Sequence, residues 1–199
     1  MNTAGNNLPV KMRRANLDNL PEFALPSGFS LRWYQPGDEE HWLRIHLAAD
    51  HFNEITPELF QKQFGVEAER GIYSASAPAP ASGIKSALLR ERQCYLLSPT
   101  GEVIGTGTAW FNDNFEGGRW GRVHWMAVLP EFQGRGLGKS LLSAICRRLR
   151  ELGHERAYLT TSTARVAAIG LYLRFGFEPL IRGAEAQAVW SGILRAAFR

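Results

Sequence analysis

A glycine-rich segment near the middle of the chain has the composition of a loop that binds phosphate groups through its backbone. The residues from Gln133 to Gly138 read QGRGLG and lie between a β-like stretch that stops at Pro130 and an amphipathic helix. Glycine allows the main chain to adopt positive φ and to come close to a ligand. The first N–H groups of the following helix are unpaired and lie at the positive end of its dipole, so they favour an anion. The pattern therefore predicts a diphosphate site at this loop.

Two common nucleotide-binding motifs do not fit the loop. Gly138-Lys139-Ser140 reads like the end of the Walker pattern, but that pattern needs a glycine where Gln133 stands. The dinucleotide fingerprint G-x-G-x-x-G fails in both possible registers, because Lys139 and Leu141 occupy positions that require glycine. The ligand is therefore expected to be neither a nucleoside triphosphate nor a dinucleotide.

The segment does match the pattern Q/R-x-x-G-x-G/A, with Gln133, Gly136 and Gly138 in the defined positions. This pattern resembles the acetyl-CoA signature of the GCN5-related N-acetyltransferases, the GNAT superfamily. A second family-like segment, Leu171-Tyr172 followed by the sequence FGFEP at 175–179, lies at the family spacing. The resemblance extends over about residues 28–181 as an order of elements and is specific from about 122 to 179.

The resemblance implies a mixed α/β fold, the GNAT acyl-CoA N-acyltransferase fold, in which helices flank a central mixed twisted sheet. In that fold the strand before the loop carries a bulge and splays from the next strand, here expected at 157–161. Pro130 fits an interrupted ladder at this point, since proline has no N–H to donate. The implied acyl donor is acetyl-CoA, with no metal. Its pantetheine amides would pair with Val128 and Leu129, and its diphosphate would lie against Gln133, Gly134, Arg135, Gly136, Leu137, Gly138, Lys139 and Ser140.

Two side chains are candidates for the chemistry of acetyl transfer. By resemblance, Tyr172 would be the general acid that protonates the CoA thiolate. Arylalkylamine-type members of the superfamily carry a histidine before the loop that relays the amine proton, which implies this role for His124. Such a base predicts an acidic limb near pH 6 to 7 in the pH profile, where histidine ordinarily titrates. On helix periodicity alone Tyr172 would be a packing aromatic, and a strand histidine is often one too.

The sequence leaves the acceptor open. The family usually has an asparagine one or two turns before the tyrosine, whereas Arg165 stands seven residues before Tyr172. A cationic amine could be attracted by carboxylates in loops that the family places near the acceptor, although each is also an ordinary solvated side chain. These carboxylates are Asp50, Glu54, Asp113 and Glu116. The function predicted is transfer of an acetyl group to a primary amine, and the alternative is a non-catalytic acyl-CoA-binding sensor or interaction module.

Composition sets further limits on function. The 199 residues with 45% hydrophobic content suffice for one core. The net charge of +4 is scattered along the chain, so no nucleic-acid partner is expected. Cys94 and Cys146 form no CxxC pair, and the spacing by five of the three histidines from position 41 to 51 suggests no zinc site. We expect a cytoplasmic protein without signal peptide or membrane segment, and a homodimer is left open.

The order of elements predicts one domain. Residues 1–27 are expected to be an arm that wraps the domain or is partly disordered, and residues 28–199 a single GNAT domain. Within it we expect a flexible loop at about 74–86 and, where many members add a seventh strand, a C-terminal helix at about 185–198. Strands are expected at 29–34, 93–97, 103–110, 123–128 and 157–161, helices at 38–49, from 56 and at 137–152, and hairpin loops at 98–101 and 111–121.

Overall fold

A seven-stranded mixed sheet forms the centre of the molecule. The computed structural model describes residues 7–66 and 82–197. The strands are β1 (Pro9–Arg14), β2 (Ser30–Trp33), β3 (Gln93–Leu97), β4 (Val103–Phe115), β5 (Gly118–Val128), β6 (Ala157–Ser162) and β7 (Glu178–Pro179). Their order is β2-β3-β4-β5-β6-β1-β7, and neighbours are antiparallel apart from β5 and β6. This is the mixed sheet that the resemblance predicted.

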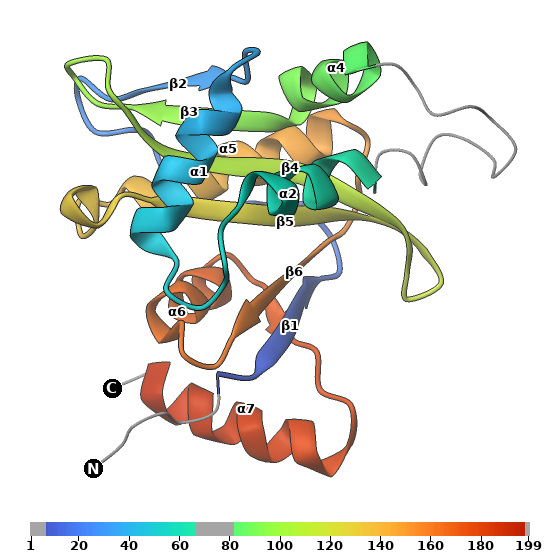
Figure 1. Ribbon diagram of the computed structural model, residues 1–199. Coiled ribbons are helices and arrows are strands. Elements are labelled where there is room, and N and C mark those ends of the chain that lie inside the picture. The colour runs from blue at the N-terminus through green and yellow to red at the C-terminus, as the bar shows by residue number, and fades with distance from the viewer. Residues whose placement is uncertain (1–6, 67–81, 198–199) are drawn as a thin grey trace, which may run out of the picture.

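Helices cover both faces of the sheet. They are α1 (Asp38–Ala49), α2 (Pro57–Gln61), η1 (Lys62–Val66), α4 (Ser82–Arg92), η2 (Pro130–Phe132), α5 (Leu137–Glu151), α6 (Val166–Arg174) and α7 (Gly183–Ala197). Figure 1 shows α1 and α2 in front of β4 and β5, α5 behind them, and α7 below β1. Because β3 and β4 are covered on both faces, nearly every residue of their central parts is buried.

Helix α5 packs through the apolar stripe that the sequence predicted. Leu141, Leu142, Ile145 and Leu149 are each no more than 1% exposed. They lie at steps of one, three and four, which places them on one face of a helix. Gly107 of β4 lies opposite this stripe, and a Cβ there would collide with Ile145. The helix therefore approaches the sheet closely and holds its own first turn, next to the glycine-rich loop, in a fixed position.

Residues 9–14 form a strand of the sheet, within the stretch 1–27 that the sequence predicted to be an arm. Strand β1 lies between β6 and β7, and Pro9 pairs with Ser162. Val10 and Met12 are buried while Lys11 and Arg13 point to solvent, an alternation of period two that marks a half-buried strand. With only two apolar residues in six, the pattern was too short to separate from the surrounding Asn- and Pro-rich sequence.

The hairpin of β4 and β5 also differs from the prediction. The loop expected at 111–121 is a two-residue turn at Glu116 and Gly117, both with positive φ, and the strands continue on either side. Phe115 stacks on Tyr158 at 3.8 Å between ring centroids, so aromatic packing extends the strands through an Asn- and Gly-rich sequence. The loop expected at 74–86 lies outside the described residues up to 81, and residues 82–86 begin α4. The predicted C-terminal helix corresponds to α7.

Strands β5 and β6 diverge after three paired positions. The last parallel pair is Val123 with Leu159. Two residues of β5, Trp125 and Met126, face the single residue Gly107 of β4, and Trp125 has a φ of 46°. This β-bulge bends the strand away from β6, as bulges next to functional sites commonly do. The splayed pair of strands that the resemblance predicted is therefore present, and Figure 1 shows β6 running away from β5.

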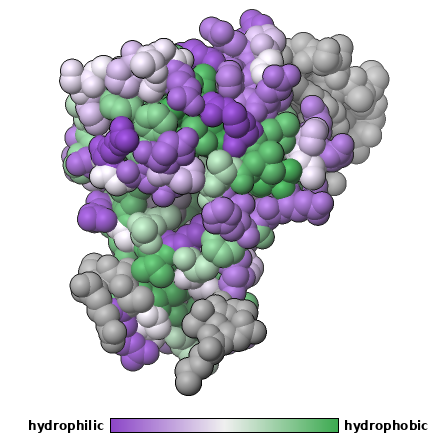
Figure 2. Space-filling model, turned by 60° about the vertical axis from the view of Figure 1, so that its left-hand side comes forward, coloured by the Kyte–Doolittle hydropathy of each residue, from purple (hydrophilic) through white to green (hydrophobic). Residues whose placement is uncertain are grey.

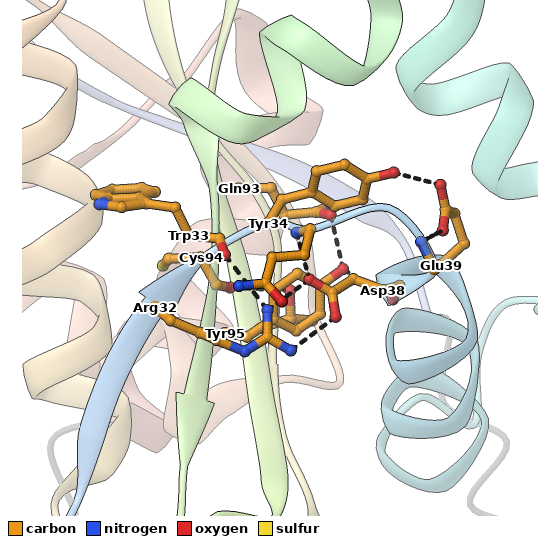
Figure 3. A network of polar contacts seen from close by, with 11 residues as sticks. Arg32, Trp33, Tyr34, Asp38, Glu39, Gln93, Cys94 and Tyr95 are labelled. Carbon is orange, nitrogen blue, oxygen red and sulfur yellow. Dashed lines mark hydrogen bonds and ion pairs between the residues drawn. The ribbon is translucent and has the colours of Figure 1, made fainter.

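A polar network fixes the beginning of α1 to the edge of the sheet (Figure 3). Arg32 of β2 donates two hydrogen bonds, of 2.6 and 2.7 Å, to the carboxylate of Asp38, which also accepts the Gln35 N–H at 2.6 Å. The Tyr95 hydroxyl lies 3.0 Å from the Asp38 carbonyl oxygen and 2.7 Å from Gln93 Oε1, and it can donate to one of them at a time. The network sets where α1 starts, and so where its last turn ends.

Candidate active site

A cleft of about 1370 Å³ opens where β5 and β6 separate. Its sides are the end of α1, the second half of β5, the loop at 133–139, the end of β6 and the helix α6. On the face shown in Figure 2 the molecule narrows from a broad upper part to a slimmer lower part, where hydrophobic side chains are exposed. The volume exceeds that of ordinary ligand pockets, which suits a long ligand together with a second substrate.

The glycine-rich loop, which lines this cleft, has unpaired backbone donors. The N–H groups of residues 134–138 donate to no acceptor within the described part of the chain. Gly134 and Gly136 have φ values of 76° and 80°, so the chain turns there in a conformation that side chains disfavour. Gln133 ties the loop to the end of β5, because its Nε2 donates to the Val128 carbonyl at 2.9 Å. Five free donors at the beginning of α5 suit a diphosphate.

The predicted cofactor residues divide into two groups. Those that line the cleft are Val128, Gln133, Gly134, Gly136, Leu137, Gly138 and Lys139. The other three do not line the cleft, and one polar group of each has a partner elsewhere. The Leu129 N–H donates to the Ile104 carbonyl at 2.8 Å, the Arg135 guanidinium lies over the ring of Phe132, and the Ser140 hydroxyl donates to the Ala24 carbonyl at 2.7 Å. The loop therefore offers a phosphate mainly its backbone.

Tyr172 lies on α6 and faces the same cleft. It is 8% exposed, and its hydroxyl has no hydrogen-bond partner among the described residues. Burial raises the pKa of this phenol to about 12, against the opposing charge of Arg165 and with a smaller contribution from Cys146. Near neutral pH the hydroxyl is therefore protonated, which is the state that a general acid requires.

His124 lies at the floor of the cleft, on β5. It is 5% exposed, and its ring centroid is 5.6 Å from that of Phe64 and 6.1 Å from that of Trp125. Burial, followed by the charges of Arg122 and His46, holds the pKa of His124 well below its usual range. The imidazole is therefore neutral and able to accept a proton, but an acidic limb that depends on it lies below the pH 6 to 7 expected from the sequence.

The end of α1 contributes two cleft residues, His46 and Asp50. Asp50 is among the carboxylates that the sequence suggested for attracting an amine, whereas the sequence predicted no role for His46. Asp50 accepts a hydrogen bond of 2.7 Å from Arg165, which stands at the start of α6. Asp50 also accepts the Phe52 N–H and the Asn53 side-chain amide. His46 is 2% exposed and lies beside Trp42 and Trp125. For His46 the only signal in the sequence was its spacing of four from Trp42 and Asp50. This spacing became informative once β5 was known to pack against α1.

Of the four carboxylates considered for attracting an amine, one lies in the cleft. That residue is Asp50. Glu116 is at the turn between β4 and β5, where Arg13 and Arg182 pair with it at 2.8 and 2.6 Å, and Asp113 pairs with Arg119 at the same hairpin. Asp50 is itself paired with Arg165, so no uncompensated carboxylate side chain faces the cleft from residues 7–66 and 82–197.

Two further observations concern metal ions and membranes. No group of three or more His, Cys, Asp or Glu side chains in the described ranges is arranged to hold a metal ion. Among the helices that the structure describes, none combines the length and apolar character needed to cross a bilayer.

With the fold and the cleft described, comparison with known proteins identifies the family. Residues 66–177 match the model of the acetyltransferase (GNAT) family, which is more than half of the chain. The chain therefore belongs to the GNAT family.

Two of the curated relatives illustrate the similarity in sequence. The chain is 31% identical over 172 residues to a mycothiol acetyltransferase of Pseudarthrobacter chlorophenolicus, covering 84% of this chain and 48% of that protein. It is 36% identical over 165 residues to a mycothiol acetyltransferase of Saccharomonospora viridis, covering 79% of this chain and 48% of that protein. The chain thus spans about half the length of the curated relatives it matches.

A solved structure shares the fold. A GCN5-related N-acetyltransferase from Sphaerobacter thermophilus superposes with a TM-score of 0.63 at 20% identity, over 86% of this chain and 48% of that one. At this level of identity the likeness concerns the arrangement of strands and helices.

Proposed function

We propose that this protein transfers an acetyl group from acetyl-CoA to a primary amine. The observation that carries the proposal is the set of free N–H groups at 134–138, in a loop that lines the same cleft as Tyr172 and His124. A diphosphate at the loop would leave the pantetheine arm to run between the separated strands β5 and β6. The thioester would then reach the part of the cleft where the two candidate side chains lie.

The proposed chemistry needs three proton-handling events. The acceptor ammonium loses one proton, for which the neutral imidazole of His124 is the candidate base. The free amine attacks the thioester carbon, and the tetrahedral intermediate collapses with loss of the CoA thiolate. The Tyr172 hydroxyl gives its proton to that thiolate and is restored by the second proton from the former amine. One proton per turnover is released to solvent.

The acceptor is the open part of this proposal. The curated relatives are named mycothiol acetyltransferases, so the acceptor of those enzymes is the first candidate to test. The alternative function is a sensor that binds acyl-CoA in the same cleft without transferring the acyl group. The proposed location is the cytoplasm, in keeping with two buried free cysteines.

Calorimetry and a thiol-release assay test the proposal together. We expect acetyl-CoA to bind with micromolar affinity and to raise the melting temperature, and ATP to do neither. Free CoA should appear when acetyl-CoA is incubated with a panel of amines that includes the acceptor of the mycothiol acetyltransferases. Absence of both heat and thermal shift with acetyl-CoA would contradict the proposal for this chain.

The substitution Tyr172→Phe separates an enzyme from a sensor. It keeps the ring and its contact with Phe177, at 6.2 Å between centroids, and removes the only proton donor of the side chain. With a substrate for which chemistry limits the rate, kcat should fall by about 10² or more while acetyl-CoA affinity changes little. An unchanged kcat would show that Tyr172 is a packing residue.

A further inference from the structure

Two residues on one face of α1, Trp42 and His46, contact the bulged part of β5, and the C-cap residue Asp50 follows them. Trp42, His46 and Asp50 are spaced by four, so they lie in a row along the helix. The His46 ring is 4.4 Å from that of Trp42 and 5.0 Å from that of Trp125, centroid to centroid. His46 and Asp50 are the members of the row that reach the cleft.

The bulge brings His124 to the same place. In a regular strand consecutive side chains point to opposite faces, but the positive φ of Trp125 breaks this alternation. The Trp125 ring consequently contacts Trp42, at 5.1 Å between centroids, on the α1 side of the sheet, where His124 also packs against Phe64. Two histidines from elements far apart in the sequence therefore flank one indole ring.

Both histidines have an unsatisfied nitrogen. Nε2 of His46 and Nε2 of His124 are buried and have no hydrogen-bond partner in the described structure. Leaving a buried polar atom unpaired costs about 1–3 kcal/mol, so such atoms usually have a partner, often an ordered water. Both residues line the cleft, so a water held between them would meet more than one polar group.

We propose that His46 is a positioning residue for the proton transfer, acting on His124 through a water shared between their Nε2 atoms. This inference rests on the proposed acetyl transfer. The ammonium proton of the acceptor passes to the imidazole pair, one neutral ring becomes an imidazolium, and the proton then leaves to solvent before the next turnover. No bond other than N–H and O–H bonds is made or broken in this step.

The groups around the two histidines act differently on their pKa values. Burial lowers the pKa of His46 to about 4, Asp50 and the Trp125 backbone raise it, and Arg165 lowers it. For His124, burial, Arg122 and His46 all lower the pKa. Asp50 is thus the one carboxylate among the groups that shift the two pKa values, and it acts on His46.

Substitution of His46 tests the inference through the pH profile. His46→Gln keeps an amide that can hold the water but cannot take a proton, and His46→Phe keeps the ring without nitrogens. We expect kcat/KM to fall by about tenfold or more in His46→Phe and less in His46→Gln. In both variants the acidic limb should move to higher pH, because His124 loses a neighbour that can become positive. The KM for acetyl-CoA should not change.

The matched control is His41→Gln. His41 lies on the same helix, half-buried, and contacts Tyr95 outside the cleft. The substitution His41→Gln should leave both kcat/KM and the acidic limb of the pH profile unchanged. If the enzyme transfers acetyl groups and His46→Gln leaves the limb in place, His46 has a purely structural role and the inference is wrong, while the proposed function stands.

Histidine NMR titration gives a readout that needs no turnover. In the unliganded protein the ring signals of His46 and His124 should titrate well below the ordinary histidine value of about 6.5, and His46→Gln should raise the pKa of His124. An unchanged His124 titration would overturn the coupling whatever the activity. Coupled titration in a protein that acetylates no amine would instead support the pair and contradict acetyl transfer.

Discussion

Gly136 and Gly138 are glycines for different physical reasons. Gly136 precedes α5 with a φ of 80°, where any L side chain would be strained. Gly138 lies inside the first turn of the helix, and a Cβ there would have Leu171 Cδ2 as its nearest neighbour at 3.7 Å, an ordinary contact. The folded chain therefore needs glycine at 136, whereas at 138 only a ligand on the free N–H groups would need it.

The substitution Gly138→Ala should consequently separate binding from stability. Alanine is the better helix former by roughly 1 kcal/mol, so the melting temperature should stay equal or rise. The added methyl group would stand where a diphosphate approaches the helix, so acetyl-CoA affinity should fall by about tenfold or more. Calorimetry and thermal denaturation measure the two effects on the same sample.

Gly192→Ala is the matched control, since it lies in α7 with no heavy atom within 4 Å of the added Cβ. It should leave acetyl-CoA binding unchanged. Equal affinities of Gly138→Ala and the wild type would show that the diphosphate does not lie over the first turn of α5.

At the scale of residues, the sequence alone predicted the loop and Tyr172 as site residues but predicted no role for His46. The loop and the tyrosine belong to local motifs, so a single stretch of chain was enough to predict them. The role proposed for His46 depends on the packing of α1 against β5 and on the positive φ of Trp125. Neither is encoded in the residues around His46, because both arise from contacts distant in sequence.

Among the elements, α1 connects the edge of the sheet to the cleft. Its first residue is held by Arg32 in the network of Figure 3, and its last turn presents His46 and Asp50. Burial favours the neutral acid of Asp38, yet the hydrogen bonds from Arg32 and Gln35 outweigh it and lower the pKa. The fixed start of α1 thus determines where its last turn, with His46, lies.

Asp38→Asn should loosen this anchor. The amide loses the charge that pairs with Arg32 but can still accept the Gln35 N–H. We expect the free energy of unfolding in urea to fall by about 1.5–3 kcal/mol, the range for hydrogen bonds to charged groups. Glu40→Gln, an exposed position in the same first turn, should change it by no more than about 0.5 kcal/mol. A loss no larger in Asp38→Asn than in this control would show that the anchor is not needed for stability.

Elements with a clear apolar pattern were predictable, and those with few apolar residues were not. The stripe of α5 and the strands at 93–97 and 103–110 lie where the sequence placed them. Strand β1 and the tip of the β4–β5 hairpin were missed. Their residues read locally as arm and loop, and pairing with β6 and stacking on Tyr158 override this preference.

On the scale of the whole molecule, buried histidines link stability to pH. Burial lowers the pKa of His46 and of His154 to about 4, and the pKa of His124 also lies well below its ordinary value. In the unfolded chain these groups titrate near 6.5, so between pH 6.5 and 4 the unfolded state binds more protons. Stability is therefore complete above pH 6.5 and decreases as the pH falls through this window.

We expect urea unfolding to show this decrease directly, with roughly 3 kcal/mol from His46 alone over the full window. His46→Phe should flatten the decline, while His51→Asn, at an exposed position, should not. Asp38 and Asp50, whose pKa values are lowered, add a further loss below about pH 4. A stability that is constant from pH 7 to 4.5 would contradict the burial of neutral histidines.

Strand β1 also has a kinetic consequence. Strands β3, β4 and β5 pair with their sequence neighbours, whereas β1 must meet β6 and β7 from the other end of the chain. Closing so long a loop is slow, so the β6-β1-β7 half of the sheet should form after the other half. The cleft lies between β5, which belongs to one half, and β6, which belongs to the other. In refolding, the ability to bind acetyl-CoA should therefore appear later than most of the helical circular dichroism signal, and a ligand bridging the two halves would act as a clasp that slows their separation.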